Sequence, residues 1–401
     1  MESIQIVLEK RTCIAGGAVS GEVILNFPLM QQEQIDEVYL KFKGSVYTFI
    51  SPARTDLNET KDVDIIRDRI AVWSRGSAYP PPDSHTLSVP FTFNFPPEIP
   101  PSFEFTVLES RAVVRYGVEA VGARPGALRL NKRVFVPVVG LPADPYGAQL
   151  RAGPLAGPAS GWTGPWTTVV MQKNIRTGFW GEYAEVSVEF RYPTLMSVPI
   201  WTPIPFTLTV VTTSKTCKRT SDSESGPIWP APPTKPEDVR LELVRTAYVR
   251  TGHLTWTQKD RIALLGRLGE HKKGEDIRVQ TAQKAWLPNS ETKGRWKQQT
   301  SFTSSLDLSC SPSFKSPTLS VEYALAIVAP FSGMNNTAQL DIPISISSGV
   351  IPRLYTNSAG GDTAPPLYDS SAEPQPTLEL PPYVILAAQL SRSAIYSWYF
   401  N

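Results

Sequence analysis

The chain has 401 residues, of which 41% are hydrophobic and 19% are charged, and its formal net charge is +2. A chain of this length can form two or three domains with sizeable cores, and its near-neutral charge gives no reason to expect nucleic-acid binding. The 38 prolines and the lack of a long helical pattern favour an all-β protein with many turns.

Residues 1–140 alternate between hydrophobic and polar residues in the way that is typical of strands. Val38, Leu40 and Phe42 recur at every second position, which predicts one face in a core and the other in solvent. The segment 63–73 fits helical spacing but is rich in β-branched residues, so its structure is left open. The other strands expected here lie at Ile4–Leu8, Val23–Leu25, Phe91–Phe95, Val114–Ala120 and Val134–Val139.

Three later segments have the composition of connections rather than of strands. Residues 141–165 are rich in proline and glycine and predict a linker between two domains. Residues 215–238 predict a long exposed loop, and residues 351–401 predict a disordered C-terminal tail. The strands expected in the second domain, 166–350, lie at Thr167–Met171, Val186–Phe190, Phe206–Val211, Val239–Val244, Leu319–Val328 and Leu340–Ile346.

A short pattern occurs once in each domain. Pro101-Ser102-Phe103 precedes a segment that contains Tyr116, and Pro312-Ser313-Phe314 precedes a segment that contains Tyr323. Small or aliphatic residues follow both tyrosines at the positions expected of a buried strand. We interpret the pattern as two copies of one sandwich, each turning a corner into a core strand. The alternative is a chance coincidence of common strand residues.

The cysteines and the hydrophobic runs bear on location. The sequence has three cysteines, Cys13, Cys217 and Cys310. Their odd number and wide spacing favour a reducing compartment over a disulfide scaffold or a zinc site. The sequence opens without a signal-peptide pattern and contains no uninterrupted apolar run of about 18 residues. We therefore expect a cytoplasmic protein without a transmembrane helix.

The C-terminal tail carries two tyrosine motifs. Pro365-Pro366-Leu367-Tyr368 is a PPxY sequence, and Leu380-Pro381-Pro382-Tyr383 fits the looser LPxY form. Adjacent prolines favour the polyproline II shape that the aromatic groove of a WW domain binds. The two tyrosines are fifteen positions apart, and a flexible linker of that length spans roughly 20 Å, which would let both motifs bind tandem WW domains with raised avidity. The alternative is a proline-rich tail that contains tyrosines by chance.

Several segments of the first domain resemble the arrestin family, in particular the fungal arrestin-related trafficking adaptors, or alpha-arrestins. The resemblance covers most of residues 1–140 and extends more loosely over 166–350. It implies two tandem immunoglobulin-like β-sandwich domains, an arrestin-like N-terminal domain at 1–140 and a C-terminal domain at 166–350, followed by a disordered tail. The resembling segments are Ala15–Val23, Ile35–Gly44, Phe91–Phe103 with Pro100-Pro101-Ser102-Phe103, and Val113–Ala120.

The resemblance also implies a function. Alpha-arrestins use PPxY motifs to recruit HECT-type ubiquitin ligases through WW domains, and we carry this role over only to the two tail motifs. The chain is then an adaptor that links membrane transporter or receptor cargo to the ligase for ubiquitin-dependent endocytosis and sorting. Its expected location is the cytoplasm, with peripheral association at the plasma membrane or endosomes. The chain departs from the family at Gly16-Gly17, where the family usually has Pro-Gly.

Basic residues gather between Arg240 and Lys297, where 13 Lys and Arg accompany 6 Asp and Glu. We interpret this excess as a surface for anionic lipid head groups or acidic cargo tails. The alternative is that these charges are the solvated faces of strands and loops. The centres expected for the surface are His271, Lys272, Lys273, Lys293, Arg295 and Lys297.

Patterns typical of catalysis are missing from the sequence. The three histidines have no neighbours at metal-ligand spacing, and no GxSxG, Walker A or strand-linked GxGxxG sequence occurs. We assign no catalytic residue, metal or cofactor and expect a non-enzymatic protein. Two alternatives stay open. One is an arrestin-fold sorting or coat scaffold that acts without a ubiquitin ligase, and the other is an all-β carbohydrate-active enzyme, which needs two close carboxylates in a cleft.

Overall fold

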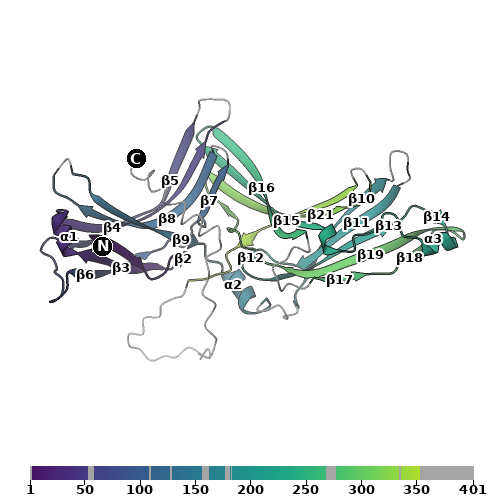
Figure 1. Ribbon diagram of the computed structural model, residues 1–401, viewed down its shortest axis with the longest axis horizontal. Coiled ribbons are helices and arrows are strands. Elements are labelled where there is room, and N and C mark those ends of the chain that lie inside the picture. Colours follow the sequence, from purple (N-terminus) through teal and green to yellow (C-terminus); the bar gives the residue numbers. More distant parts are fainter. Residues whose placement is uncertain are drawn as a thin grey trace. The chain divides into compact units, whose positions relative to one another are not determined.

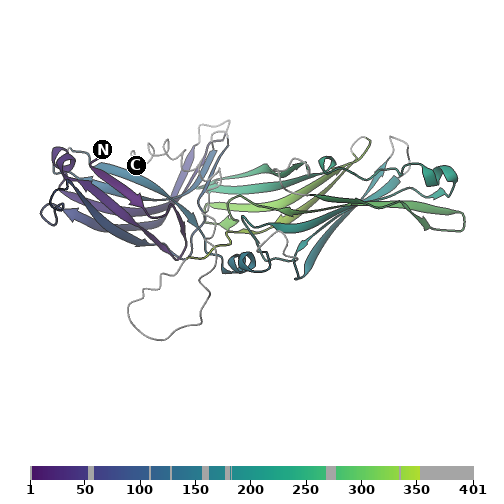
Figure 2. The same cartoon turned by 60° about the horizontal axis from the view of Figure 1, so that its bottom comes forward.

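The computed structural model describes residues 2–52, 58–107, 110–126, 129–155, 162–176, 181, 183–267, 277–333 and 336–352. Strands make up most of this part of the chain, and its helices are short (Figure 1, Figure 2). The all-β prediction is therefore confirmed. The described residues divide into two compact units, the first within 1–143, 250–254 and 350–352, and the second within 144–249 and 255–349.

The first unit is a β-sandwich built from two sheets. One sheet has the strand order β1-β3-β6, and the other has the order β2-β9-β8-β4-β5 with β7 paired to β8. A six-residue helix, α1 (Phe27–Gln32), follows β3 and is capped by the side chain of Asn26. The strands are β1 (Ile4–Leu8), β2 (Thr12–Ile14), β3 (Ala18–Asn26), β4 (Glu37–Ile50), β5 (Glu59–Ser74), β6 (Thr86–Asn94), β7 (Phe103–Val107), β8 (Ser110–Ala123) and β9 (Lys132–Leu141).

Aromatic side chains join the two sheets of the first unit. The ring of Phe42 on β4 lies 5.4 Å from that of Phe93 and 5.5 Å from that of Phe95, measured between centroids. The ring of Phe95 in turn lies edge-on to Tyr116 of β8 at 5.1 Å. The alternating residues that predicted these strands thus form the core between the sheets, where each buried aromatic ring contributes a large apolar area.

The segment 63–73, which the sequence left open, belongs to β5. Its pairing with β4 shifts register between Val38 and Tyr39 and again between Gly44 and Ser45. Each shift leaves one extra residue in β5, so the inward positions are spaced by three residues at those points instead of two. The two bulges therefore explain why a strand shows spacing that resembles a helix.

The second unit contains a seven-stranded and a five-stranded sheet. The first has the order β10-β11-β13-β19-β14 with β17 and β18 paired to β19, and the second has the order β16-β15-β21-β20 with β22 paired to β21. A parallel pair, β12 and β23, forms a third small sheet. The strands are β10 (Trp166–Arg176), β11 (Tyr183–Pro193), β12 (Val198–Pro199), β13 (Ile204–Thr213), β14 (Cys217–Lys218), β15 (Arg240–Thr251), β16 (Leu254–Arg267), β17 (Arg278–Thr281), β18 (Ala285–Pro288), β19 (Lys293–Leu306), β20 (Phe314–Lys315), β21 (Leu319–Pro330), β22 (Thr337–Ile344) and β23 (Ile346–Ser347).

Two connections differ from the sequence expectation. The predicted linker 141–165 contains a helix, α2 (Pro145–Ala152), because Asp144 caps its N-terminus and Pro145 suits its first turn. The predicted loop 215–238 contains β14, the short helix α3 (Ser221–Ser225) and the 3-10 turn η1 (Pro236–Asp238). Ile228 in this segment is buried, so the segment is anchored to its unit instead of being exposed along its whole length.

The repeated Pro-Ser-Phe pattern forms the same corner in both units. The hydroxyl of Tyr116 donates a hydrogen bond of 2.7 Å to the carbonyl of Pro100, and that of Tyr323 donates one of 2.8 Å to Ser311. Phe103 pairs with Val114, and Phe314 pairs with Val321, two residues before the respective tyrosine. Both Pro-Ser-Phe segments therefore form the same hydrogen-bonded corner beside a central strand.

The serine of each corner ties it to a third segment. The backbone N–H of Ser102 donates to the carbonyl of Gly140 at 2.8 Å, and the Ser102 hydroxyl oxygen accepts from the N–H of Gly140 at 2.9 Å. Ser313 makes the same two bonds with Ile346, at 2.8 and 2.9 Å. Each corner therefore joins three segments of its unit through backbone and side-chain hydrogen bonds.

Removing either tyrosine hydroxyl should destabilise its own unit. Tyr116→Phe removes the partner of the half-buried Pro100 carbonyl, and Tyr323→Phe removes that of the buried Ser311 carbonyl, so we expect the free energy of unfolding to fall by about 1–2 kcal/mol. Urea unfolding measures this loss. Tyr39→Phe is the control, because the buried Tyr39 ring stacks under Arg69 and a phenylalanine keeps that ring. Equal stability of all three variants and the wild type would contradict the role assigned to the corners.

The two buried cysteines should be nearly unreactive at neutral pH. Burial raises the pKa of Cys13 to about 11 and that of Cys310 to about 12, which suppresses the nucleophilic thiolate. Cys217 is only half-buried. At pH 8 we expect Ellman's reagent to modify one thiol rapidly in the native protein, none in Cys217→Ser, and three in the urea-unfolded wild type. Three fast thiols in the native protein would show that the cores open readily.

Candidate functional site

The structure describes only part of the site expected from the sequence. The two tail motifs, Pro365–Tyr368 and Leu380–Tyr383, lie outside the described residues, and so do His271, Lys272 and Lys273. The remaining members of the expected basic surface, Lys293, Arg295 and Lys297, lie on β19 of the second unit. They occupy alternate positions and therefore share one face of the seven-stranded sheet.

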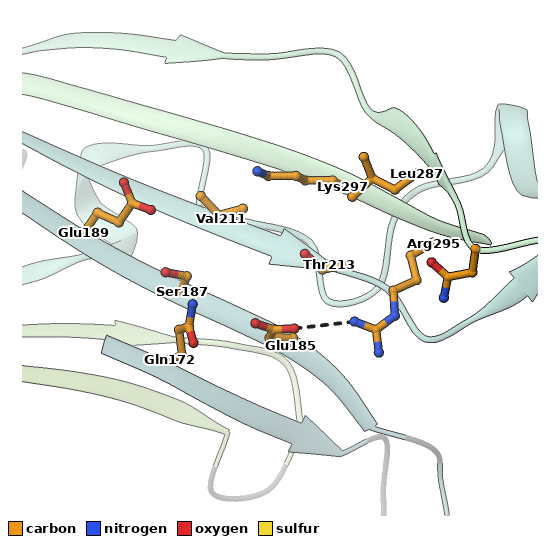
Figure 3. Close-up of a pocket in the computed structure, with 10 residues that line it drawn as sticks. Gln172, Glu185, Ser187, Glu189, Val211, Thr213, Leu287, Arg295 and Lys297 are labelled. Carbon is orange, nitrogen blue, oxygen red and sulfur yellow. Dashed lines mark hydrogen bonds and ion pairs between the residues drawn. The ribbon is translucent and has the colours of Figure 1, made fainter. Parts of the chain in front are cut away.

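Arg295 and Lys297 line a groove on that face. The groove has a volume of about 390 Å³, and its lining comes from β10, β11, β13, β19 and the residues at and just after β18 (Figure 3). The register places Glu185, Thr213 and Lys297 in one row across three neighbouring strands. The lining residues are Gln172, Glu185, Ser187, Glu189, Val211, Thr213, Leu287, Asn289, Arg295 and Lys297.

Opposite charges lie on the two sides of the groove. An Arg295 guanidinium nitrogen lies 3.4 Å from a carboxylate oxygen of Glu185, and Figure 3 shows this pair bridging the strands. Glu189 adds a second carboxylate from β11, and Lys297 has no ion-pair partner in the part of the chain that the structure describes. Two acidic and two basic residues give a local charge balance near zero. The groove is therefore polar and mixed in sign.

The floor of the groove supplies neutral polar groups. Ser187 and Thr213 carry hydroxyls between the charged walls, and Gln172 carries an amide on the neighbouring β10. Val211 and Leu287 provide apolar surface, and Leu287 is exposed. This composition suits an extended polar ligand or peptide whose own charges alternate in sign.

The spacing of the two carboxylates argues against glycoside hydrolysis in this groove. Glu185 and Glu189 are four residues apart on one strand, which separates their Cα atoms by roughly 13 Å. Glycosidases need carboxyl groups about 5–9.5 Å apart across the scissile bond. No group of three or more metal-ligating side chains occurs within the described ranges either.

The acidic wall was missed by the sequence analysis. Glu185, Ser187 and Glu189 alternate with the buried Val186, Val188 and Phe190, so their outward direction was implicit in the strand predicted at 186–190. Pairing of β11 with β19 through β13 was not implicit, because register between distant strands depends on the whole sheet.

Comparison with known proteins adds no family to this geometry. No family model matches the chain, and no curated protein matches it significantly. Among the described helices, none has the length and apolar character needed to cross a bilayer.

Releasing Arg295 from its partner should make the groove attract anions. In Glu185→Gln the ion pair is lost, and the Arg295 cation becomes available to a lipid surface. One cation near an anionic surface contributes about 1 kcal/mol of binding free energy, which is roughly fivefold in affinity. Sedimentation with vesicles containing phosphatidylserine measures this gain. Glu9→Gln makes the same change in net charge at an exposed site of the first unit and should have little effect. Equal gains in both variants would mean that net charge, and not the groove, sets vesicle binding.

Proposed function

We propose that this protein is a non-enzymatic adaptor that links membrane-protein cargo to a HECT-type ubiquitin ligase bearing WW domains. The observation that carries the proposal is the PPxY sequence at 365–368, followed by the LPxY sequence at 380–383. The described body supports it by offering β-sandwich surfaces to cargo, with charged side chains on outward faces. The adaptor would act in the cytoplasm, at the plasma membrane or at endosomes, in ubiquitin-dependent endocytosis and sorting.

The position of residues 350–352 supports a ligase-binding tail that is tethered to the first unit. Residues 350–352 belong to the first unit, and a methyl group placed on Gly17 would lie 3.2 Å from Cβ of Pro352. This close approach gives a physical reason for a glycine in the Gly16-Gly17 turn. Tyr368 follows Pro352 by sixteen residues, so a fully extended chain holds it within roughly 55 Å of that anchor. A ligase bound at Tyr368 would therefore stay close to the first unit.

The proposed mechanism is proximity. A tethered ligase meets cargo lysines at an effective concentration in the millimolar range when the linker matches the distance to be spanned. Orientation of the two reactants in one complex replaces a bimolecular encounter. The adaptor would accelerate ubiquitin transfer in this way while taking no part in the chemistry.

Binding of tandem WW domains tests the proposal. Tyr368→Ala should remove the avidity of about 10²–10⁴ that two sites provide, and Tyr368→Ala with Tyr383→Ala should abolish the remaining single-site binding as well. Tyr355→Ala is the matched control, since Tyr355 lies in the same tail but outside both motifs. Calorimetric titration of the full chain with a tandem WW fragment measures all three.

Unchanged binding in the double variant would remove the main support for an adaptor. The scaffold alternative would then take precedence, and deletion of 351–401 would leave cargo sorting intact. Loss of sorting on that deletion, together with loss of WW binding in the double variant, supports the adaptor.

A further inference from the structure

A second group of charged residues lies on the first unit, on the face of the six-stranded sheet that points away from the core. Even-numbered residues of β4 fill the core, so Lys41 and Lys43 point outward. Arg69 on β5 and Glu119 on β8 lie directly opposite Lys41 in the register. Arg133 on β9 pairs with Val121, the next residue after Glu119 on the same face. We refer to Lys41, Lys43, Arg69, Glu119 and Arg133 as the outer-face cluster.

A single buried carboxylate holds two of these cations. Glu119 is 5% exposed, and its two oxygens lie 2.7 Å from Nζ of Lys43 and 2.9 Å from a guanidinium nitrogen of Arg133. Burial alone would raise the pKa of Glu119, but the hydrogen bonds and charges of Lys43 and Arg133 hold that pKa below its usual value. Glu119 is therefore ionised at neutral pH, and its charge is shared between two partners.

Lys41 lacks a carboxylate partner of its own among the residues that the structure describes. Its ammonium lies 5.5 Å from the centroid of the Tyr39 ring, which Arg69 also covers. Arg69 in addition pairs with Glu37 at 3.4 Å. Partial burial lowers the pKa of Lys41, as does repulsion from Lys43, Arg133 and Arg69, and attraction from Glu119 only partly opposes this. An additional anion at this position would relieve the repulsion among four neighbouring cations.

We propose that the outer-face cluster binds an acidic side chain of an extended peptide segment, with the carboxylate seated beside Lys41 and between Arg69 and Arg133. One carboxylate would give Lys41 the ion-pair partner that it lacks among the described residues. The positive charge around Lys41 covers only a small area of this face. Carboxylates lie on the same face at neighbouring positions of β4 and β5, namely Glu37, Asp62 and Asp64. These carboxylates would repel an anionic bilayer spread over the face but leave a single acidic side chain free to approach Lys41. The geometry therefore favours a peptide over a membrane.

The inference rests on the proposed function only in identifying the peptide as part of a cargo protein. It assigns a cargo contact to the first unit, separate from the groove of the second unit and from the tail. Binding at the outer-face cluster is expected to be unaffected by Tyr368→Ala with Tyr383→Ala, so failure of the tail motifs and failure of this site are distinguishable.

Fluorescence anisotropy with a labelled hexaglutamate peptide and the full chain at low ionic strength tests the proposal. Lys41→Gln removes one charge-assisted hydrogen bond and should weaken binding about tenfold. Lys41→Arg keeps the charge and should retain binding to within about threefold, which also shows that the position tolerates substitution. Lys61→Gln is the matched control, because Lys61 on β5 is exposed and pairs with Thr48, on the other face of the sheet.

Three outcomes would overturn the proposal. One is equal peptide affinity of Lys41→Gln and the wild type. A second is an equal loss of affinity in Lys41→Gln and Lys61→Gln, which would mean that net charge alone sets peptide binding. The third is binding of phosphatidylserine vesicles that depends on Lys41 in the absence of any peptide binding, which would make a lipid surface the occupant. Loss of peptide binding in Lys41→Gln alone, with thermal unfolding unchanged, supports it.

Discussion

The hydrogen bond from a buried tyrosine hydroxyl to a corner carbonyl is the constraint on which both units depend. Tyr116 and Tyr323 stand on central strands, and each reaches the carbonyl that precedes a Pro-Ser-Phe turn. A buried carbonyl and a buried hydroxyl are both costly when unpaired, so satisfying them together specifies where the short strand starts. The serine of the same turn then fixes a third segment through two further bonds. One corner thereby sets the mutual positions of three segments in each unit.

The corners and the aromatic cores occupy the inward faces, and the two charged clusters described above lie on outward faces, where their register decides what they can bind. In the second unit the register places Glu185 beside Arg295, and the groove is close to neutral. In the first unit Lys43 and Arg133 share Glu119, and Lys41 makes no ion pair with any described residue. The same alternation of strand residues thus produces a balanced polar groove in one unit and a local positive excess in the other.

Much of the fold was predictable from the sequence because buried strands alternate strictly, as in Val38, Leu40 and Phe42. The prediction was incomplete where alternation is interrupted: bulges displaced the pattern in β5, and the helix α2 was hidden in a segment rich in proline and glycine. Attention to Asp144-Pro145, a cap followed by a favourable first residue, would have revealed that helix. The charged sites were harder to predict from the sequence. Pairing between distant strands brings together Lys41 and Glu119 in one unit, and Glu185 and Arg295 in the other. The sequence gives the type of each residue but not its neighbours on other strands.

The central claim is that one chain holds cargo and ligase in a single complex. The most direct measurement is the initial rate of ubiquitin transfer from a WW-containing HECT ligase to a lysine-bearing acidic peptide, recorded as the concentration of this protein is raised. A bridging adaptor predicts a bell-shaped dependence, because excess adaptor places ligase and peptide in separate complexes. A rate that does not change with the protein, or that rises to a plateau and stays there, would contradict the account.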